Sequence, residues 1–120
     1  MRGLQIKLNR VSSVEVIEMT GALDAVAFAQ FGTTLMRTME ESTPCIVLEC
    51  SGVTYIGSAQ LKELLNFTHL AQARGGDLKY VGLSPAIQGL ARLIARGDVM
   101  EFYDSVPQAL QAFRRAEPSR

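Results

Sequence analysis

The segment that most constrains the fold is a short apolar run in the middle of the chain, Cys45-Ile-Val-Leu-Glu-Cys50. A nearly continuous apolar run of this length is typical of a central strand covered on both sides, although an edge position stays open. The segments on either side have a helical apolar period, at Phe28, Phe31, Leu35 and Met39 before it and at Leu61, Leu64, Leu65, Thr68 and Ala71 after it. The run therefore predicts a sheet with helices packed against it.

The first part of the chain predicts a hairpin followed by a helix. Residues 4–8 alternate between apolar and polar side chains, which predicts a half-buried strand. Residues 14–19 predict a second strand, and the short polar connection makes the two an antiparallel hairpin. Gly21 is expected to break this strand. Asp24 can then cap a helix over residues 25–41.

The rest of the chain alternates between helices and strands. Ser42-Thr43-Pro44 ends the first helix, because proline cannot continue it. Residues 51–57 predict a loop with two glycines, and residues 58–74 predict a helix that Gly75-Gly76 ends. The remaining elements are a strand over 78–82, a helix, a short strand over 99–103 and a second helix over 105–115. The first of these helices has Ser84 as its cap and Pro85 at its first position. Its predicted buried stripe is Ile87, Leu90, Ala91 and Ile94. This order predicts an α/β fold with a mixed sheet of four to five strands and about four helices.

Length and charge limit the function classes. A chain of 120 residues fits one domain over 1–120, with a core at about 4–113 and a frayed polar tail at 116–120. Twelve basic and twelve acidic side chains cancel, which argues against a nucleic-acid binder. No apolar run approaches the ~20 residues that span a bilayer, and residues 1–8 lack a signal-peptide core. We expect a cytoplasmic protein without direct membrane insertion.

The side chains that carry catalytic chemistry are few. His69 is the only histidine, which excludes a multi-histidine metal site. If Ser58 and His69 share one helix, they lie ~16 Å apart along its axis, too far to act as nucleophile and base. Cys45 and Cys50 on one strand would face opposite sides ~17 Å apart, so we expect free buried thiols rather than a disulfide or a metal site. No phosphate-binding glycine loop is present. We therefore expect neither an enzyme nor a cofactor.

Ser58 stands at the predicted junction of a loop and a helix N-terminus. Its plain role there is a helix N-cap, which contributes ~1 kcal/mol. The same position also suits a phosphate, because the helix dipole and unpaired N–H groups favour negative charge. Phosphorylation would add about −1.5 to −2 charge. A partner docked against this junction would meet both the steric bulk and the negative charge of the phosphate.

Five sequence landmarks follow one another along the chain. They are Thr20-Gly-Ala-Leu-Asp24, Ile46-Val-Leu-Glu-Cys-Ser-Gly-Val-Thr-Tyr-Ile56, Ser58 with Leu61, Gly75-Gly-Asp-Leu and Val81-Gly-Leu-Ser-Pro85. In their order and spacing they resemble the STAS domain, and specifically the single-domain bacterial antagonists of anti-sigma factors. The similarity covers about residues 4–113.

The resemblance implies a protein that binds an anti-sigma factor, which is also a serine kinase, and so frees the sigma factor. The kinase phosphorylates a serine at the start of the second helix, which breaks the complex, and a phosphatase resets the cycle. That serine maps onto Ser58 as the phosphoacceptor. The implied partner-binding residues are Asp24, Gly57, Ser58, Ala59, Gln60 and Leu61, while the oligomeric state is left open.

Two residues depart from the family motif Asp-Ser-Ser/Thr/Ala-Gly. Gly57 stands in place of the aspartate and Gln60 in place of the glycine. The first change alters the charge beside the phosphoacceptor, and the second crowds a close-docking partner. An alternative is therefore a non-phosphorylated STAS subunit of a larger assembly, such as a lipid-transport ABC complex. A third hypothesis is an enzyme or a nucleotide-binding protein, since nucleotide binding has been suggested within the family.

Overall fold

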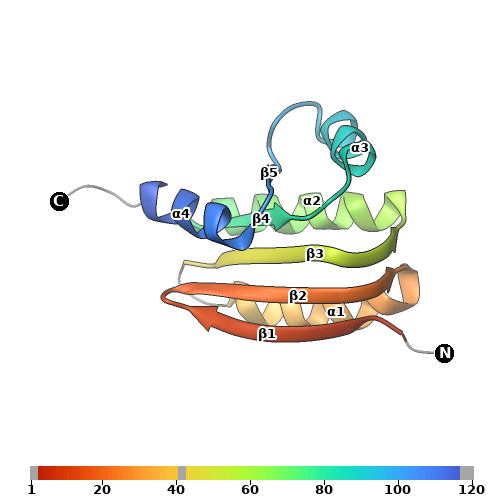
Figure 1. Ribbon diagram of the computed structural model, residues 1–120, viewed down its shortest axis with the longest axis horizontal. Helices are drawn as coiled ribbons and strands as arrows, with labels where there is room; N and C mark the ends of the chain where they lie inside the picture. Colours follow the sequence, from red (N-terminus) through yellow and green to blue (C-terminus); the bar gives the residue numbers. More distant parts are fainter. Residues whose placement is uncertain (1–2, 41–42, 117–120) are drawn as a thin grey trace.

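The chain forms a five-stranded sheet with helices on both faces (Figure 1). The structure is a computed structural model that describes residues 3–40 and 43–116. Strand order across the sheet is β1-β2-β3-β4-β5; the first pair is antiparallel and the other three pairs are parallel. The elements are β1 (Gln5–Val11), β2 (Val14–Leu23), α1 (Ala25–Met39), β3 (Cys45–Ile56), α2 (Ser58–Ala73), β4 (Asp77–Val81), α3 (Pro85–Ala95), β5 (Glu101–Tyr103) and α4 (Val106–Ala116). The predicted fold class is therefore confirmed.

The loop predicted over residues 51–57 is wrong, because β3 continues to Ile56. Its extra length pairs with the end of β2, which runs past Gly21 to Leu23. Gly21 adopts a positive φ of 115°, and the register between the two strands shifts beside it. Glycines that predict a break in an isolated strand are accommodated here by two irregularities in the pairing.

Two of the predicted capping residues, Asp24 and Ser84, act as helix N-caps. The carboxylate of Asp24 accepts a hydrogen bond from the Ala27 N–H at 2.9 Å, and Ser84 accepts one from the Ile87 N–H at 3.3 Å. The described part of α1 ends at Met39, and Glu41 lies outside the described residues. The predicted tail lies outside them as well, apart from residue 116 at the end of α4.

The described residues contain no helix with the length and apolar composition that crossing a bilayer requires.

The buried faces of α2 and α3 were predicted with different success. The predicted buried face of α2 is confirmed, with only Leu65 half-exposed. The stripe predicted on α3 is confirmed only in part, because Leu90 is exposed while Ala91 is buried. In α3 only one side of the helix contacts the core, so the stripe is narrower than the pattern indicated.

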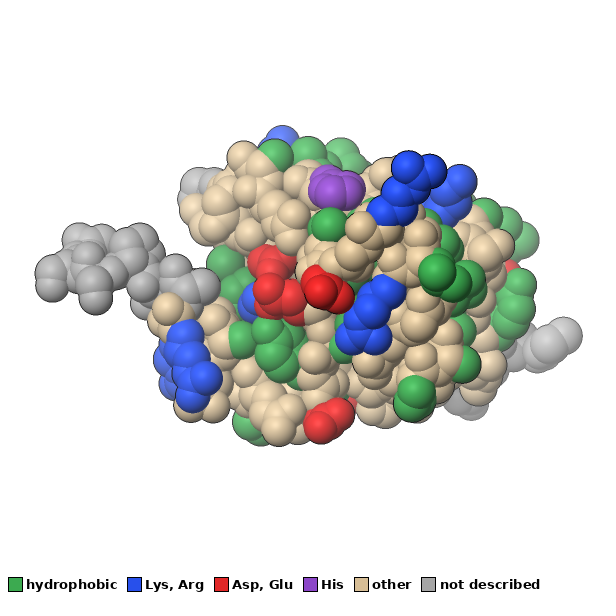
Figure 2. Space-filling view, turned by 90° about the horizontal axis from the view of Figure 1, so that it is seen from above, with side chains coloured by type: hydrophobic (Ala, Val, Ile, Leu, Met, Phe, Trp, Pro, Cys, Tyr) green, Lys and Arg blue, Asp and Glu red, His purple; other side chains and the backbone are tan. Residues whose placement is uncertain are grey.

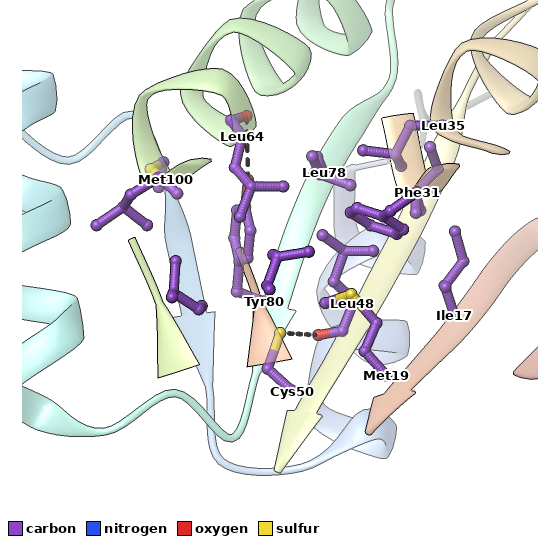
Figure 3. Packing of buried hydrophobic residues seen from close by; sticks show 14 of the residues in the cluster. Ile17, Met19, Phe31, Leu35, Leu48, Cys50, Leu64, Leu78, Tyr80 and Met100 are labelled. Atoms are coloured by element: carbon purple, nitrogen blue, oxygen red, sulfur yellow. Dashed lines mark hydrogen bonds between the residues drawn. The ribbon is translucent and has the colours of Figure 1, made fainter. Parts of the chain in front are cut away.

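The core lies on both faces of the sheet. The larger cluster packs between the sheet and α1 and α2, where Ile17, Phe31, Leu48, Leu64 and Tyr80 meet (Figure 3). A smaller cluster lies under α4, and includes Val47 and Phe113. β3 is therefore a central strand covered on both sides, as its apolar run predicts. At about 25 cal/mol per Å² of buried apolar surface, this burial is the main stabilising contribution.

The two cysteines lie on opposite sides of β3, as predicted. Cys50 belongs to the larger cluster, whereas Cys45 is half-buried and packs against the smaller one. Burial raises the pKa of the Cys50 thiol, which donates to the Leu48 carbonyl at 3.6 Å. Neither cysteine forms a disulfide bond. A buried, protonated thiol is unreactive, so Cys50 acts as a packing residue.

A buried pair of hydroxyl groups attaches α2 to β4. The Thr68 and Tyr80 hydroxyl oxygens lie 2.8 Å apart, and both lie within hydrogen-bond distance of the Leu64 carbonyl, at 2.9 and 3.2 Å. Burial raises the pKa of Tyr80 and keeps the phenol protonated. Just beyond the C-terminal end of the helix, Gly76 packs against the Pro44 carbonyl so closely that a Cβ atom would overlap it. These contacts fix where α2 lies on the sheet.

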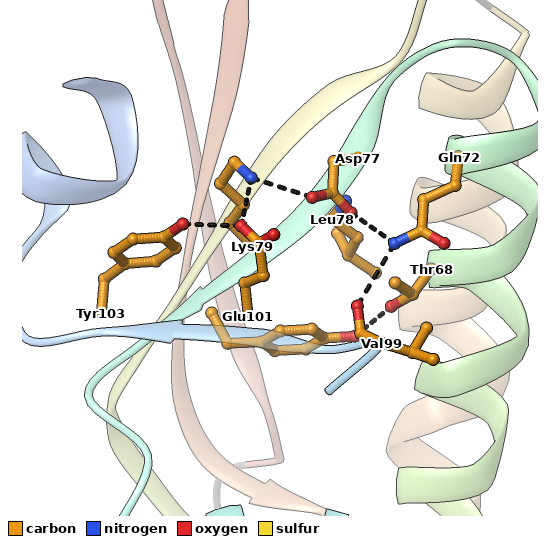
Figure 4. A network of polar contacts seen from close by, with 9 residues as sticks. Thr68, Gln72, Asp77, Leu78, Lys79, Val99, Glu101 and Tyr103 are labelled. Atoms are coloured by element: carbon orange, nitrogen blue, oxygen red, sulfur yellow. Dashed lines mark hydrogen bonds and ion pairs between the residues drawn. The ribbon is translucent and has the colours of Figure 1, made fainter. Parts of the chain in front are cut away.

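A buried ammonium group crosses from β4 to β5 on the opposite face (Figure 4). Lys79 Nζ donates to Asp77 at 2.8 Å and to Glu101 at 2.6 Å, and it lies 4.7 Å from the Phe113 ring centroid. The Tyr103 hydroxyl donates to the same Glu101 oxygen at 2.6 Å. Burial alone favours the neutral amine, but the hydrogen bonds to both carboxylates outweigh it and raise the pKa of Lys79. Burial likewise opposes ionisation of Glu101, yet bonds from Lys79 and Tyr103 lower its pKa.

We predict that Glu101→Gln destabilises the protein by about 1 kcal/mol at neutral pH. The pKa of Glu101 is lowered in the folded state, so its contribution is present above the ordinary value of 4.5 and is lost as pH falls through the folded-state pKa. The pKa of Lys79 is raised, so its contribution is present below 10.5 and is lost as pH rises through its folded-state pKa. Urea unfolding of both proteins from pH 3 to pH 8 measures the difference, which should shrink below about pH 4.5. A pH-independent difference would contradict this assignment.

Candidate functional site

Two helix N-termini lie side by side at the carboxyl ends of the neighbouring strands β2 and β3. Leu23 and Ile56 are register partners on the parallel strands β2 and β3. The residues that follow them, Asp24 and Gly57, are the N-caps of α1 and α2. Parallel pairing therefore brings the acidic residue of the first landmark next to the segment that carries Ser58. The carboxyl ends of parallel strands are a common location for binding sites in α/β proteins.

Ser58 is exposed and is the first residue of α2, but the predicted N-cap role is wrong. Gly57 is the N-cap, and it offers no side chain to the N–H groups of the first turn. The first intrahelical bond runs from the Leu61 N–H to the Gly57 carbonyl at 3.0 Å. The hydroxyl of Ser58 is therefore free of a capping role. The helix end beside it keeps its positive partial charge without a side-chain acceptor.

The side chain of Gln60 covers Gly57. A Cβ atom added at Gly57 would overlap Oε1 of Gln60 and would lie 3.1 Å from the Tyr55 hydroxyl oxygen. The backbone of Gly57 is extended, with φ −76° and ψ 154°, so any residue could adopt it. A side chain at 57 would therefore meet no backbone strain, but the flexible end of Gln60 would have to move to admit it. The two departures from the family motif are thus one local arrangement, in which a side chain at 60 occupies the space beside 57.

The structure divides the six predicted contact residues into two groups. Asp24, Ser58 and Ala59 are exposed, whereas Gly57, Gln60 and Leu61 are buried. Leu61 retains 1 % of its surface and belongs to the core, so its side chain positions α2 and presents no surface. The carboxylate of Asp24 is engaged with the Ala27 N–H. That this set contacts a partner stays a prediction.

A groove between α1 and α2 begins at Gln60 and was not predicted from the sequence. Its volume is about 620 Å³, and Phe28, Met36 and Phe67 contribute apolar surface to it. Met36 is half exposed and Val26, on the same helix, is 79 % exposed. Tyr55 was missed as well, although strand alternation places it on the same side as residue 57. The exposed apolar positions on α1 were the one available signal for the groove.

The remaining surface offers little catalytic chemistry near Ser58. His69 is exposed on the same helix as Ser58. It lies ~16 Å from Ser58 along the helix axis, as predicted. Figure 2 shows acidic, basic and apolar side chains together on the face of the molecule that is seen from above. What the site offers is an accessible hydroxyl beside the positive end of a helix, a combination that suits an anion.

A family model described as the STAS domain matches residues 5–109. The chain belongs to the STAS-domain family. No curated protein sequence matches this STAS protein. The family match spans all five strands and part of α4, and it includes both helix N-termini at the candidate site.

Solved structures share the fold at low sequence identity. An anti-sigma factor antagonist from Mycobacterium paratuberculosis has a TM-score of 0.80 and 22 % identity, over 93 % of this chain and 95 % of that chain. The Bacillus cell fate determinant SpoIIAA in its phosphorylated form has a TM-score of 0.71 and 18 % identity, over 90 % and 98 %. The murine Solute Carrier 26 family member A9 anion transporter gives 0.71 and 12 %, over 96 % of this chain and 22 % of the transporter. The STAS fold therefore occurs both in small antagonists and within a transporter.

We predict that Asp24→Ala and Ser58→Ala differ in their effect on stability. Loss of the Asp24 cap should lower the free energy of unfolding by about 1 kcal/mol. Ser58 caps nothing and is exposed, so its replacement should change that energy by less than about 0.5 kcal/mol. Urea unfolding of both variants measures the contrast. An equal loss in Ser58→Ala would show that its hydroxyl caps α2 in solution.

Proposed function

We propose that this STAS protein is an anti-sigma-factor antagonist that binds a serine-kinase anti-sigma factor and is switched off by phosphorylation of Ser58. The observation that carries the proposal is the exposed hydroxyl of Ser58 at the N-terminus of α2. The antagonist from Mycobacterium paratuberculosis and SpoIIAA, which is also described as an anti-sigma factor antagonist, share the fold over nine-tenths of this chain, which supports the same class of partner.

The proposed switch is a phosphoryl transfer from ATP. The Ser58 oxygen forms a bond to the γ-phosphorus, the bond from that phosphorus to the β–γ bridging oxygen breaks, and ADP leaves. The hydroxyl proton passes to a base on the kinase. The product carries about −1.5 to −2 additional charge on a chain whose formal charge is zero. A phosphatase then restores the hydroxyl by hydrolysis.

The groove between α1 and α2 supplies the adjoining docking surface. It begins at Gln60, near Ser58, and exposes apolar side chains such as Met36. A partner that covers this groove also covers the start of α2. Burying a phosphate there without a cationic partner group is unfavourable, because a charge removed from water loses its solvation. Phosphorylation therefore separates the complex without any change in fold.

We predict that Ser58→Asp weakens binding to the anti-sigma factor at least about tenfold, whereas Ser58→Ala binds as the wild type does and accepts no phosphate. Calorimetry with the purified kinase-type anti-sigma factor of the same organism measures affinity. Mass spectrometry after incubation with ATP locates the phosphate.

Ser12→Asp is the matched control for the added charge. Ser12 is exposed in the turn between β1 and β2, at the opposite end of the sheet, so this variant should retain wild-type affinity. Equal affinity of the wild type, Ser58→Asp and Ser58→Ala would exclude the switch.

A second candidate function is a non-phosphorylated subunit of a larger assembly, such as a lipid-transport ABC complex. The match to a domain within an anion transporter favours it, as does the loss of the motif aspartate at Gly57. This function predicts stable association with a transporter ATPase. It also predicts that no kinase of the organism places phosphate on Ser58.

A further inference from the structure

A polar hollow lies between β4, β5 and α4, on the face of the sheet opposite to the α1–α2 groove. Its volume is about 550 Å³, and small-molecule sites typically measure about 300–1,000 Å³. Lys79 lines it from β4, and Glu101 and Tyr103 line it from β5. A hollow of this size with several convergent polar side chains is a candidate ligand site.

The α4 wall of the hollow is one stripe of the helix. Gln108, Gln111, Ala112 and Arg115 line it, at spacings of three, one and three residues, which is one helix face. The neighbouring face of α4 packs on the sheet through the buried Phe113. The helix therefore presents a polar stripe to the hollow while its apolar face stays in the core.

The charged groups at the base of the hollow are held by the network in Figure 4. The side chain of Lys79 retains 5 % of its surface, and its ammonium group is shared between Asp77 and Glu101. Lys79 and Tyr103 both donate to Oε1 of Glu101, at 2.6 Å each, so this network leaves Oε2 as an acceptor. One ammonium between two carboxylates leaves a net negative charge. A fixed carboxylate oxygen of this kind suits an incoming ammonium group.

The α4 wall supplies donors instead. Oε1 of Gln108 accepts from the Asp104 N–H at 3.1 Å, which leaves Nε2 of the same carboxamide to donate. Arg115 is exposed in the last turn of α4, and no other residue in the described part of the chain forms an ion pair with it. A guanidinium group presents its donors in a fork that matches a carboxylate. The two walls therefore offer charges of opposite sign.

We propose that this hollow binds a small zwitterion, an amino acid or a short peptide, with its ammonium group on Glu101 and its carboxylate on Arg115. Nε2 of Gln108 donates a further hydrogen bond to the ligand. A simple anion would be repelled by the Glu101 carboxylate, and a simple amine would leave Arg115 unpaired. A ligand that carries both charges engages both walls. This binding does not depend on Ser58, because α2 packs on the other face of the sheet.

Amide NMR spectra of the isotope-labelled full chain test the site, during titration with each standard L-amino acid and with glycylglycine. At least one of these probes should produce saturating shifts in β5 and at residues 108–115, with a Kd below about 1 mM. The probe that binds is then compared with its N-acetyl form and with its C-terminal amide. Each modified form lacks one of the two charges, so each should bind at least about tenfold more weakly.

Arg115→Gln and Arg114→Gln are a matched pair. Both remove one exposed positive charge from the last turn of α4, but only Arg115 lines the hollow. Arg115→Gln should weaken binding at least about tenfold, whereas Arg114→Gln should retain wild-type affinity. Glu101→Gln should weaken binding as well. Where circular dichroism shows that this variant is not folded, the N-acetyl probe tests the same contact from the side of the ligand.

Several outcomes would overturn the zwitterion site. One is that no probe gives saturating shifts up to about 10 mM, or that the shifts saturate elsewhere on the chain. Another is that the N-acetyl form or the amide binds as tightly as the unmodified probe. Equal weakening by Arg115→Gln and Arg114→Gln would show that only the overall charge of α4 matters.

Discussion

Two buried hydroxyl groups hold the helix that carries the candidate site. Thr68 and Tyr80 bond to each other and to the Leu64 carbonyl, in a part of the core that solvent does not reach. Leaving either hydroxyl without a partner would cost about 1–3 kcal/mol, so only one placement of α2 on β4 satisfies both. The N-terminus of the helix, and with it Ser58, has a defined position because the helix body cannot shift along the sheet.

The opposite face of the sheet is stabilised by charge rather than by hydroxyl groups. Lys79 is buried between two carboxylates that belong to different strands, and two aromatic rings lie near its ammonium group. This arrangement joins β5 and α4 to β4, far from the α1–α2 groove. It was not predicted, because a lysine in a short strand ordinarily points to solvent. Its apolar neighbours Leu78 and Tyr80 were the available signal.

Local features of the sequence were predicted well, and features that depend on distant pairing were not. The apolar run of β3 and the caps Asp24 and Ser84 are local, and the structure confirms them. The extension of β3 to Ile56 depends on pairing with β2, a segment about thirty residues earlier. At the site, Ser58 was placed at a helix start, but its capping role was wrong by one residue. Helix boundaries carry an uncertainty of that size.

The shared space of residues 57 and 60 couples two positions in the motif. No side chain enters at 57 while the carboxamide of Gln60 lies over it. A side chain at 57 therefore requires the carboxamide, which is the far end of a flexible side chain, to swing away from that glycine. Substitutions at the two positions should consequently change the free energy of unfolding non-additively.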